Sequence, residues 1–323
     1  MKEPSVSIVI LNWNGKKISL KCVSSLKRIT NYKNYKIIFV DNGSTDDSVK
    51  TIKKNFPKLD VVESKENLGF PKGMNLGIKY AKEKYDSDYY LFLNNDIIFY
   101  QKNWLKDLID SFKNKKVGIA NPVLRFPNKK IQRVGSKING AKNLIITSVT
   151  SIPEDISEKE LEQEKFREVD MFLGACFLVK KEVIEKIGLL DERYSPYLIE
   201  DLEYSFRAKK EGYKIVTVTN SNVIHLFHKT FKKQVIINKK RDLQRGYIVI
   251  RNAFLFSFDY LGLFKTLFMA SPLLFVTSLV EKKDKEGKNI LSNIRFRKFL
   301  FKRIYYFIKS FSNAIKLLDK EIK

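Results

Sequence analysis

Short apolar runs alternate with helix-like stretches along the first third of the chain, and this alternation constrains the fold more than any other feature. The runs are SVSIVIL (5–11), YKIIFV (35–40), LDVVES (59–64) and YYLFLN (89–94). Helical spacing is found around 17–28, after DNGSTDD, and at 71–84. Apolar strands separated by amphipathic helices are typical of a mostly parallel sheet covered on both faces. The sequence therefore predicts an α/β fold.

Each apolar run leads into polar, loop-forming residues. LNWNG ends the first run, VDNGSTD the second and NND the fourth, while ENLGFPKG follows the third. In open α/β sheets, ligands bind outside the carboxyl ends of the strands. We therefore expect the functional site where these four segments meet.

The charge of the chain is strongly asymmetric. The 323 residues carry a formal net charge of +25, from 61 basic and 36 acidic side chains. Roughly 22 basic but only roughly 7 acidic residues lie in 229–323. This excess indicates an anionic partner, and composition alone leaves nucleic acid, anionic lipid and a phosphorylated substrate open.

Cysteine usage and the N-terminal sequence bear on the compartment. Cys22 and Cys176 are the only cysteines, which predicts no disulfide framework and favours the reducing cytoplasm. The N-terminal MKEPSVSIVILNWNG has a short apolar run that asparagine interrupts, with no small-residue cleavage site. It is typical of a buried strand rather than a signal peptide.

The middle of the chain has a different pattern. Residues 125–168 have weak periodicity and an acidic stretch, EDISEKELEQEKF, and we interpret them as a variable insertion or lid without site residues. VDMFLGACFLVKKEVIEKIGLLDERY then predicts a strand and a short helix, and IEDLEYSFRAKKEGYKIVTV a helix and a strand. The composition changes after His228, so we predict one domain over 1–228 and a second region over 229–323.

The second region combines basic residues with aromatic ones. Its segment 253–280 is rich in Phe and Leu, but the uncharged core TLFMASPLLFVTSLV is shorter than the roughly twenty residues that span a bilayer. The flanking sequences, such as RFRKFLFKRIYYFIKSF, are typical of helices in an interface with anionic lipid. We predict a helical region at the inner face of the cell membrane, peripheral or with one marginal transmembrane segment. The alternative is a helical subdomain with a solvated basic face.

Acidic residues at two strand ends are candidates for chemistry. Asp96 follows the fourth apolar run directly, and its carboxylate suits a hard divalent cation that keeps open positions for phosphates. Asp41 ends the second run. Asn-Asn-Asp and Asp-Asn-Gly-Ser are also good turn sequences, so the alternative is that Asp96 and Asp41 only form turns.

Two further pairs of polar residues occur late in the first domain. Glu200 and Asp201 stand where a helix is expected to begin, so they either favour its N-terminus or lie in a partly apolar cleft, where a raised pKa suits a general base. His225 and His228 are the only histidines. In an extended segment they point to opposite faces, so at most one is expected to be functional, and a structural role is the alternative.

The motifs as an ordered set resemble those of the inverting nucleotide-sugar glycosyltransferases of family two, particularly the rhamnosyltransferase-like branch. The segments that carry the resemblance, roughly over residues 4–228, are VSIVILNWNG, IIFVDNGSTDDS, ENLGFPKGMNLGI, YYLFLNNDIIF, FLGACFLVKKEVIEKIGLLDERY, IEDLEYSFRAKKEGYKI and VIHLFH. The resemblance implies a GT-A fold: a mostly parallel sheet flanked by helices that binds a nucleotide-diphospho-sugar.

The resemblance also implies roles for individual residues. Asp96 and His225 would hold a divalent metal, manganese or magnesium, with Asn94 in a place that another acid often occupies. Asp41 would bind the nucleobase, and Gly174 and Ala175 would lie under the transferred sugar. The full set of expected donor-binding residues is Asn12, Asn14, Asp41, Asn67, Gly69, Lys72, Asn94, Asn95, Gly174 and Ala175.

The implied reaction is an inverting transfer from a nucleoside-diphosphate sugar to an acceptor hydroxyl. Asp201 would act as general base with Glu200 beside it, and His228 has no counterpart in the family. The expected acceptor is a glycan, polyprenyl-linked or at the cell surface. The alternatives are a sugar-phosphate nucleotidyltransferase and a catalytically degenerate, membrane-bound GT-A protein. Nucleic acid is not an expected partner, because no nucleic-acid-binding module is found.

Overall fold

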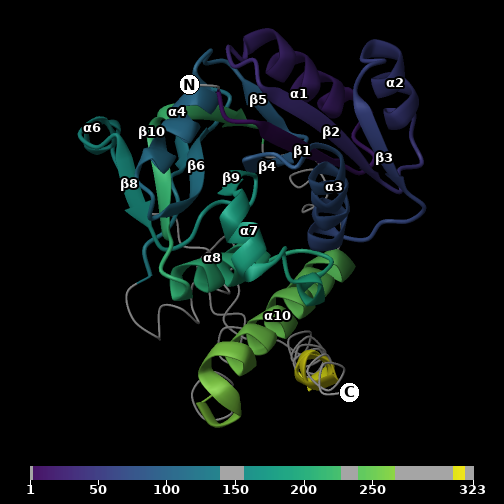
Figure 1. Ribbon diagram of the computed structural model, residues 1–323. Coiled ribbons are helices and arrows are strands. Elements are labelled where there is room, and N and C mark those ends of the chain that lie inside the picture. Colours follow the sequence, from purple (N-terminus) through teal and green to yellow (C-terminus); the bar gives the residue numbers. More distant parts are fainter. Residues whose placement is uncertain (1–2, 139–155, 227–238, 266–307, 317–323) are drawn as a thin grey trace, which may run out of the picture. The chain divides into compact units, whose positions relative to one another are not determined.

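The computed structural model describes residues 3–138, 156–226, 239–265 and 308–316 (Figure 1). The chain divides into two compact units, one of residues 1–138 and 152–229, the other of residues 139–151 and 230–323. His228 lies outside the described residues.

The first unit begins with strands and helices in alternation. They are β1 (Val6–Asn12), α1 (Lys16–Ile29), β2 (Tyr35–Asn42), α2 (Ser48–Asn55), β3 (Asp60–Ser64), α3 (Phe70–Tyr85), β4 (Tyr89–Asn94), β5 (Ile97–Phe99), α4 (Trp104–Asp110) and η1 (Ser111–Lys113). The later elements are β6 (Val117–Arg125), β7 (Ile131–Arg133), α6 (Glu158–Glu162), β8 (Phe166–Val169), β9 (Cys176–Lys180), α7 (Lys181–Ile187), η2 (Glu192–Tyr194), α8 (Glu200–Lys210) and β10 (Lys214–His225).

The strands form one sheet in the order β3-β2-β1-β4-β9-β6-β10-β5, with β7 beside β6 and β8 beside β10. The first four strands are parallel to one another. β9 runs antiparallel between β4 and β6, and β6 pairs in parallel with β10. The α/β prediction is confirmed, with a parallel first half and a mixed second half.

Alternating side chains of β1 build the core on both faces of the sheet. Helices α1 and α3 cover opposite faces (Figure 1). Ile8 and Ile10 belong to the cluster that contains Leu26 of α1, while Val9 belongs to the cluster that contains Ile78 of α3. Because side chains of a strand point alternately to its two faces, an uninterrupted apolar run fits a strand that is buried on both sides.

The predicted insertion contains regular structure that extends the sheet. β7 pairs antiparallel with β6, and β8 pairs antiparallel with β10. Both strands are only three or four residues long, which is too short for a periodic pattern to stand out.

The second unit contains helix α10 (Lys239–Lys265), with non-helical backbone at Gly262, and a helical segment at 308–316. Phe311 lies edge-on to Phe254, with 5.0 Å between the ring centroids. Within the described residues, no helix combines the length and apolar character that crossing a membrane requires. Much of the predicted membrane segment 253–280 lies outside those residues.

Candidate active site

Asn12 joins the carboxyl ends of three neighbouring strands. Its Nδ2 donates to Asp41 Oδ1 at 2.8 Å, and its Oδ1 accepts from Ser19 Oγ at 2.7 Å and from Asn95 Nδ2 at 2.9 Å. Asn12 and Asp41 are buried. A buried amide or carboxylate needs such partners to offset its lost hydration. The strand ends therefore form one fixed polar cluster, as expected.

The loop after β1 interlocks with the loop after β2. Asn14 has a left-handed backbone (φ 51°), its N–H donates to Ser44 Oγ at 2.8 Å, and its Oδ1 accepts from the Thr45 N–H at 2.7 Å. A Cβ at Gly15 would lie 2.3 Å from Asn95 Nδ2 and 2.6 Å from Asn12 Oδ1, so a larger residue there would displace side chains of the polar cluster. Trp13, between these residues, is 56% exposed.

The third loop is fixed by amide side chains. Asn42 Nδ2 donates to Asn67 Oδ1 at 3.1 Å and to the carbonyl oxygen of Gly69, also at 3.1 Å. Gly69 has φ 82°, and a Cβ there would lie 2.6 Å from Cα of Pro196. Lys72 is exposed on the first turn of α3. The loop after β3 thus packs closely against the loop that precedes α8.

Asp96 and His225 lie together. After the turn at 95–96 the chain enters β5, which pairs with β10 so that Ile97 lies opposite His225. His225 Nε2 is 3.4 Å from Asp96 Oδ2, and His225 Nδ1 is 2.7 Å from Gln132 Oε1. Two ligands at right angles on an ion with bonds of about 2.1 Å are separated by roughly 3 Å. The spacing therefore fits two ligands of one cation.

Within the described residues, no group of three or more His, Cys, Asp and Glu side chains could hold a metal ion. Asp96 and His225 would supply only two ligands. Oxygen-preferring cations commonly complete their coordination with substrate phosphates and water. The two side chains fit a metal that binds together with a diphosphate, and do not make a complete protein cage.

Glu200 and Asp201 begin α8 after two residues in left-handed backbone conformations. Leu198 and Ile199 have φ of 76° and 75°, which is a strained conformation for an apolar, branched residue. Asp201 Oδ1 accepts from the Leu202 N–H at 2.9 Å. Bulky residues are held in such conformations mainly at functional sites, where surrounding packing maintains them.

Burial controls the protonation of this acidic pair. Burial and then the neighbouring Asp201 carboxylate raise the pKa of Glu200 well above its ordinary value. Burial also raises the pKa of Asp201, while the backbone N–H groups of Leu202 and Gly174 and the Arg133 guanidinium act in the opposite direction. A partly exposed carboxylate with a raised pKa is suited to accept a proton.

Because the pKa of Glu200 is raised, the stability of the folded chain is expected to depend on pH. The folded state binds this proton more tightly than the unfolded state, so the stabilisation is present below the ordinary carboxyl pKa and is lost as pH rises through the folded pKa. We expect Glu200→Gln, which stays uncharged, to lose less thermal stability than the wild-type chain between about pH 5 and about pH 8. Thermal denaturation across this range measures the difference. The same loss of stability in both proteins would contradict the raised pKa of Glu200 in the folded state.

Contacts connect the predicted residues from one loop to the next. The Asn94 N–H donates to the Ala175 carbonyl at 2.9 Å, and a Cβ at Gly174 would lie 3.5 Å from Asp201 Oδ2. The loop under the expected sugar position therefore lies between the end of β4 and the start of α8. Among the expected donor-binding residues, Lys72 does not take part in the contacts described here.

Three residues near the site were missed in the sequence. Gln132 and Arg133 lie on β7, inside the range interpreted as an insertion without site residues. Asn75 of α3 donates to the Leu190 carbonyl at 2.8 Å and to Glu192 Oε1 at 3.1 Å, and so anchors the segment leading to α8. Asn75 could have been noticed in the sequence, because an asparagine on an otherwise apolar helix face needs a hydrogen-bond partner when it is buried.

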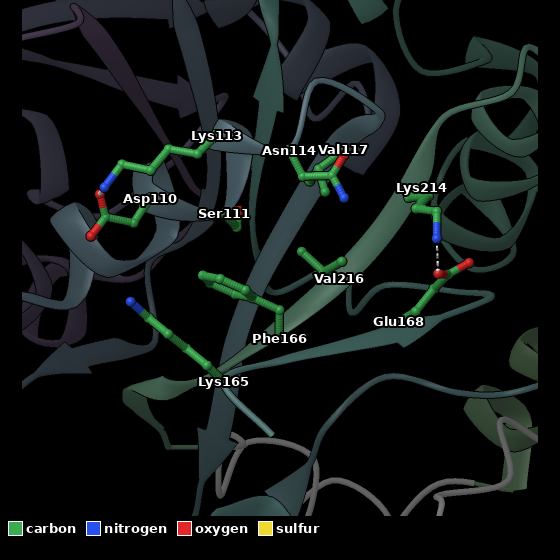
Figure 2. Close-up of a pocket in the computed structure, with 10 residues that line it drawn as sticks. All are labelled: Asp110, Ser111, Lys113, Asn114, Val117, Lys165, Phe166, Glu168, Lys214 and Val216. Atoms are coloured by element: carbon green, nitrogen blue, oxygen red, sulfur yellow. Dashed lines mark hydrogen bonds and ion pairs between the residues drawn. The ribbon is translucent and has the colours of Figure 1, made fainter. Parts of the chain in front are cut away.

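A pocket of about 310 Å³ lies elsewhere, at the starts of β6 and β10 (Figure 2). It is lined by Asp110, Ser111, Lys113, Asn114, Val117, Lys165, Phe166, Glu168, Lys214 and Val216. β6 runs in the direction of β4, so these strand starts lie at the opposite edge of the sheet from the polar cluster. Lys214 pairs with Glu168 at 2.6 Å and Lys113 with Asp110 at 2.8 Å. None of the predicted site residues lines this pocket.

The fold matches that of known glycosyltransferases. GalNAc-T7, solved with UDP, GalNAc and Mn2+, superposes with a TM-score of 0.63 at 16% identity, covering 99% of this chain and 57% of that one. This likeness shows a GT-A fold. The chain belongs to glycosyl transferase family 2, whose model matches residues 7–188, and is therefore a glycosyltransferase with this fold. The predicted resemblance is confirmed.

Two named bacterial proteins are similar to this chain. The O-antigen biosynthesis protein RfbC of Myxococcus xanthus is 25% identical over 251 residues, which are 77% of this chain but 19% of that protein. The N-acetylglucosaminyl-diphospho-decaprenol L-rhamnosyltransferase of Mycobacterium tuberculosis is 24% identical over 209 residues, 58% of this chain and 66% of that protein. The chain therefore spans about one fifth of the first relative and two thirds of the second.

Proposed function

We propose that the protein is an inverting glycosyltransferase that moves a sugar from a nucleoside-diphosphate donor to an acceptor hydroxyl. The main support is that Asp96, which follows β4, lies 3.4 Å from His225. At the ends of the neighbouring strands β1 and β2, Asn12 and Asp41 form a buried polar cluster. Cation ligands beside a fixed polar cluster suit a ligand with a diphosphate and a nucleoside. Family membership supports this proposal over a sugar-phosphate nucleotidyltransferase.

The donor is proposed to bind along the ends of β1, β2 and β4. Asp41 accepts from Asn12 and from the Ser44 N–H, one bond on each carboxylate oxygen. Each oxygen keeps a further lone pair for a nucleobase N–H. Asp96 and His225 would hold a manganese or magnesium ion, which stabilises the negative charge of the leaving diphosphate when bound. The Mn2+ in the GalNAc-T7 structure supports this cofactor.

Asp201 is proposed as the general base. As the acceptor oxygen forms its bond to the anomeric carbon, the bond from that carbon to the diphosphate oxygen breaks, and the electron pair leaves with the nucleoside diphosphate. The hydroxyl proton passes to the Asp201 carboxylate. Gly174 would lie under the sugar. A Cβ there would lie 3.5 Å from Asp201 Oδ2, so glycine leaves more space beside this carboxylate. Glu200 is the more buried partner of the pair, and burial together with the Asp201 carboxylate raises its pKa.

Stereochemistry tests the proposed reaction. The intact chain is incubated with UDP-, dTDP- and GDP-sugars and with N-acetylglucosaminyl-diphospho-decaprenol or its soluble diphosphate analogue. We expect acceptor-dependent release of one nucleoside diphosphate and, by NMR of the product, an anomeric configuration opposite to that of the donor. Retention of configuration would contradict direct displacement.

The acceptor is proposed to be lipid-linked, with the basic region holding the protein at an anionic membrane surface. The name of the mycobacterial relative and the excess of Lys and Arg in 229–323 support this. We expect the intact chain to float with vesicles that contain anionic phospholipid and to be released at about 1 M salt, where the Debye length is about 3 Å. The same flotation with vesicles of neutral lipid alone would contradict the electrostatic part of this proposal.

A further inference from the structure

Gln132 comes from a segment in which the sequence predicted no site residue, yet its side chain meets His225. Arg125 of β6 pairs with Ile131 of β7 on one side and with Ile224 of β10 on the other. Gln132 follows Ile131 at an irregularity in the β6–β7 pairing, and His225 follows Ile224, and the two side chains meet in this part of the sheet. Both side chains are partly buried.

The contact between these side chains selects one form of the imidazole. Gln132 Oε1 is 2.7 Å from His225 Nδ1. An amide oxygen only accepts hydrogen bonds, so this contact favours the neutral His225 form that carries its proton on Nδ1. The lone pair is then on Nε2, which is the nitrogen that faces Asp96 Oδ2 at 3.4 Å. This is the tautomer that a metal-binding Nε2 requires.

We propose that Gln132 is a positioning residue that fixes the His225 ring with its proton on Nδ1 and thereby presents the lone pair of Nε2 beside Asp96 to a divalent cation. The cation-binding part rests on the proposed function, whereas the control of the tautomer does not. Histidines that bind metals commonly donate their other ring N–H to an oxygen acceptor, and removal of that acceptor weakens metal binding by about tenfold to a hundredfold.

The first test reads the tautomer without metal. The chain has two histidines, so labelling of histidine with 15N gives two ring systems, and a His228→Gln variant assigns them. In long-range 1H–15N spectra, we expect His225 to carry its proton on Nδ1. Gln132→Leu is expected to move the proton toward Nε2, while Gln132→Glu keeps an acceptor and keeps the proton on Nδ1.

Gln101 provides a matched control. Its Oε1 accepts from the Asn222 N–H at 2.7 Å, so it also supports β10 but makes this bond to the backbone, away from the His225 ring. Gln101→Leu should leave the His225 tautomer unchanged. A proton on Nε2 in the wild-type chain, or the same spectrum for the wild type and Gln132→Leu, would overturn the inference.

The second test measures Mn2+ itself by electron paramagnetic resonance, in the presence of UDP, dTDP or GDP. We expect Gln132→Leu to weaken Mn2+ binding about tenfold or more, Gln132→Glu to restore it, and Gln101→Leu to leave it unchanged. Equal weakening by both Leu variants would show a general structural effect and overturn the positioning role. If the wild-type chain bound no Mn2+ but kept the Nδ1 proton, the proposed metal site would fail while the control of the tautomer by Gln132 would stand.

Discussion

Asp201→Asn is expected to lower kcat by about a hundredfold to ten-thousandfold, the usual contribution of a general base. The substitution keeps the size of the side chain, and its amide can still accept the N–H of Leu202 that now bonds Asp201 Oδ1. It removes the group that takes the proton from the acceptor hydroxyl. Binding of the nucleoside diphosphate should stay within about twofold of wild type, because the donor contacts proposed above come from other strand ends. Steady-state kinetics and calorimetry measure the two quantities.

Asp107→Asn is the matched control for this prediction. Burial raises the pKa of Asp107 on α4 as it does that of Asp201, but Asp107 lies outside the candidate site. We expect the Asp107→Asn variant to have the turnover of the wild-type chain. A loss in Asp107→Asn as large as in Asp201→Asn, or normal turnover in Asp201→Asn, would remove Asp201 from the role of base.

Asp96→Ala is expected to abolish the dependence of nucleoside-diphosphate binding on Mn2+. The wild-type chain places one carboxylate and one imidazole at a spacing that suits a shared cation, and within the described residues no third acidic, His or Cys ligand completes the group. With so few protein ligands, loss of the only charged one should weaken Mn2+ binding by at least about a hundredfold. Turnover should fall with it, since the leaving diphosphate loses its counter-charge.

Titration of Mn2+ in the presence of UDP, dTDP or GDP measures this effect. Asp110→Ala serves as the control, because Asp110 pairs with Lys113 at the opposite edge of the sheet. Unchanged Mn2+ affinity in Asp96→Ala would show that the cation, if it binds, does so elsewhere.

The polar strand ends could be predicted because sequence and topology agree there. In a parallel sheet the carboxyl ends of β1, β2 and β4 must meet at one edge, so polar residues that follow each apolar run are brought together by the fold itself. The same reasoning predicted that Asp96 follows a buried strand. The roles of these residues rest on the family resemblance and remain proposals.

Other parts of the site depend on contacts that no local pattern reveals. Gln132 lies on a strand of only three residues, and its meeting with His225 depends on which strands flank β6. The left-handed backbone at Leu198 and Ile199 could not be predicted either, because such apolar residues disfavour that conformation. Long-range packing, such as that of Asn75 against Leu190 and Glu192, imposes the course of this segment.

The most direct test of the central claim is calorimetric titration of the intact chain with UDP, dTDP and GDP, each with and without Mn2+. We predict that one of these nucleotides binds, and that Mn2+ raises its affinity at least about tenfold, which corresponds to about 1.4 kcal/mol. Failure of all three to bind in the presence of Mn2+ would contradict the assignment of the strand-end cluster as a nucleotide-sugar site.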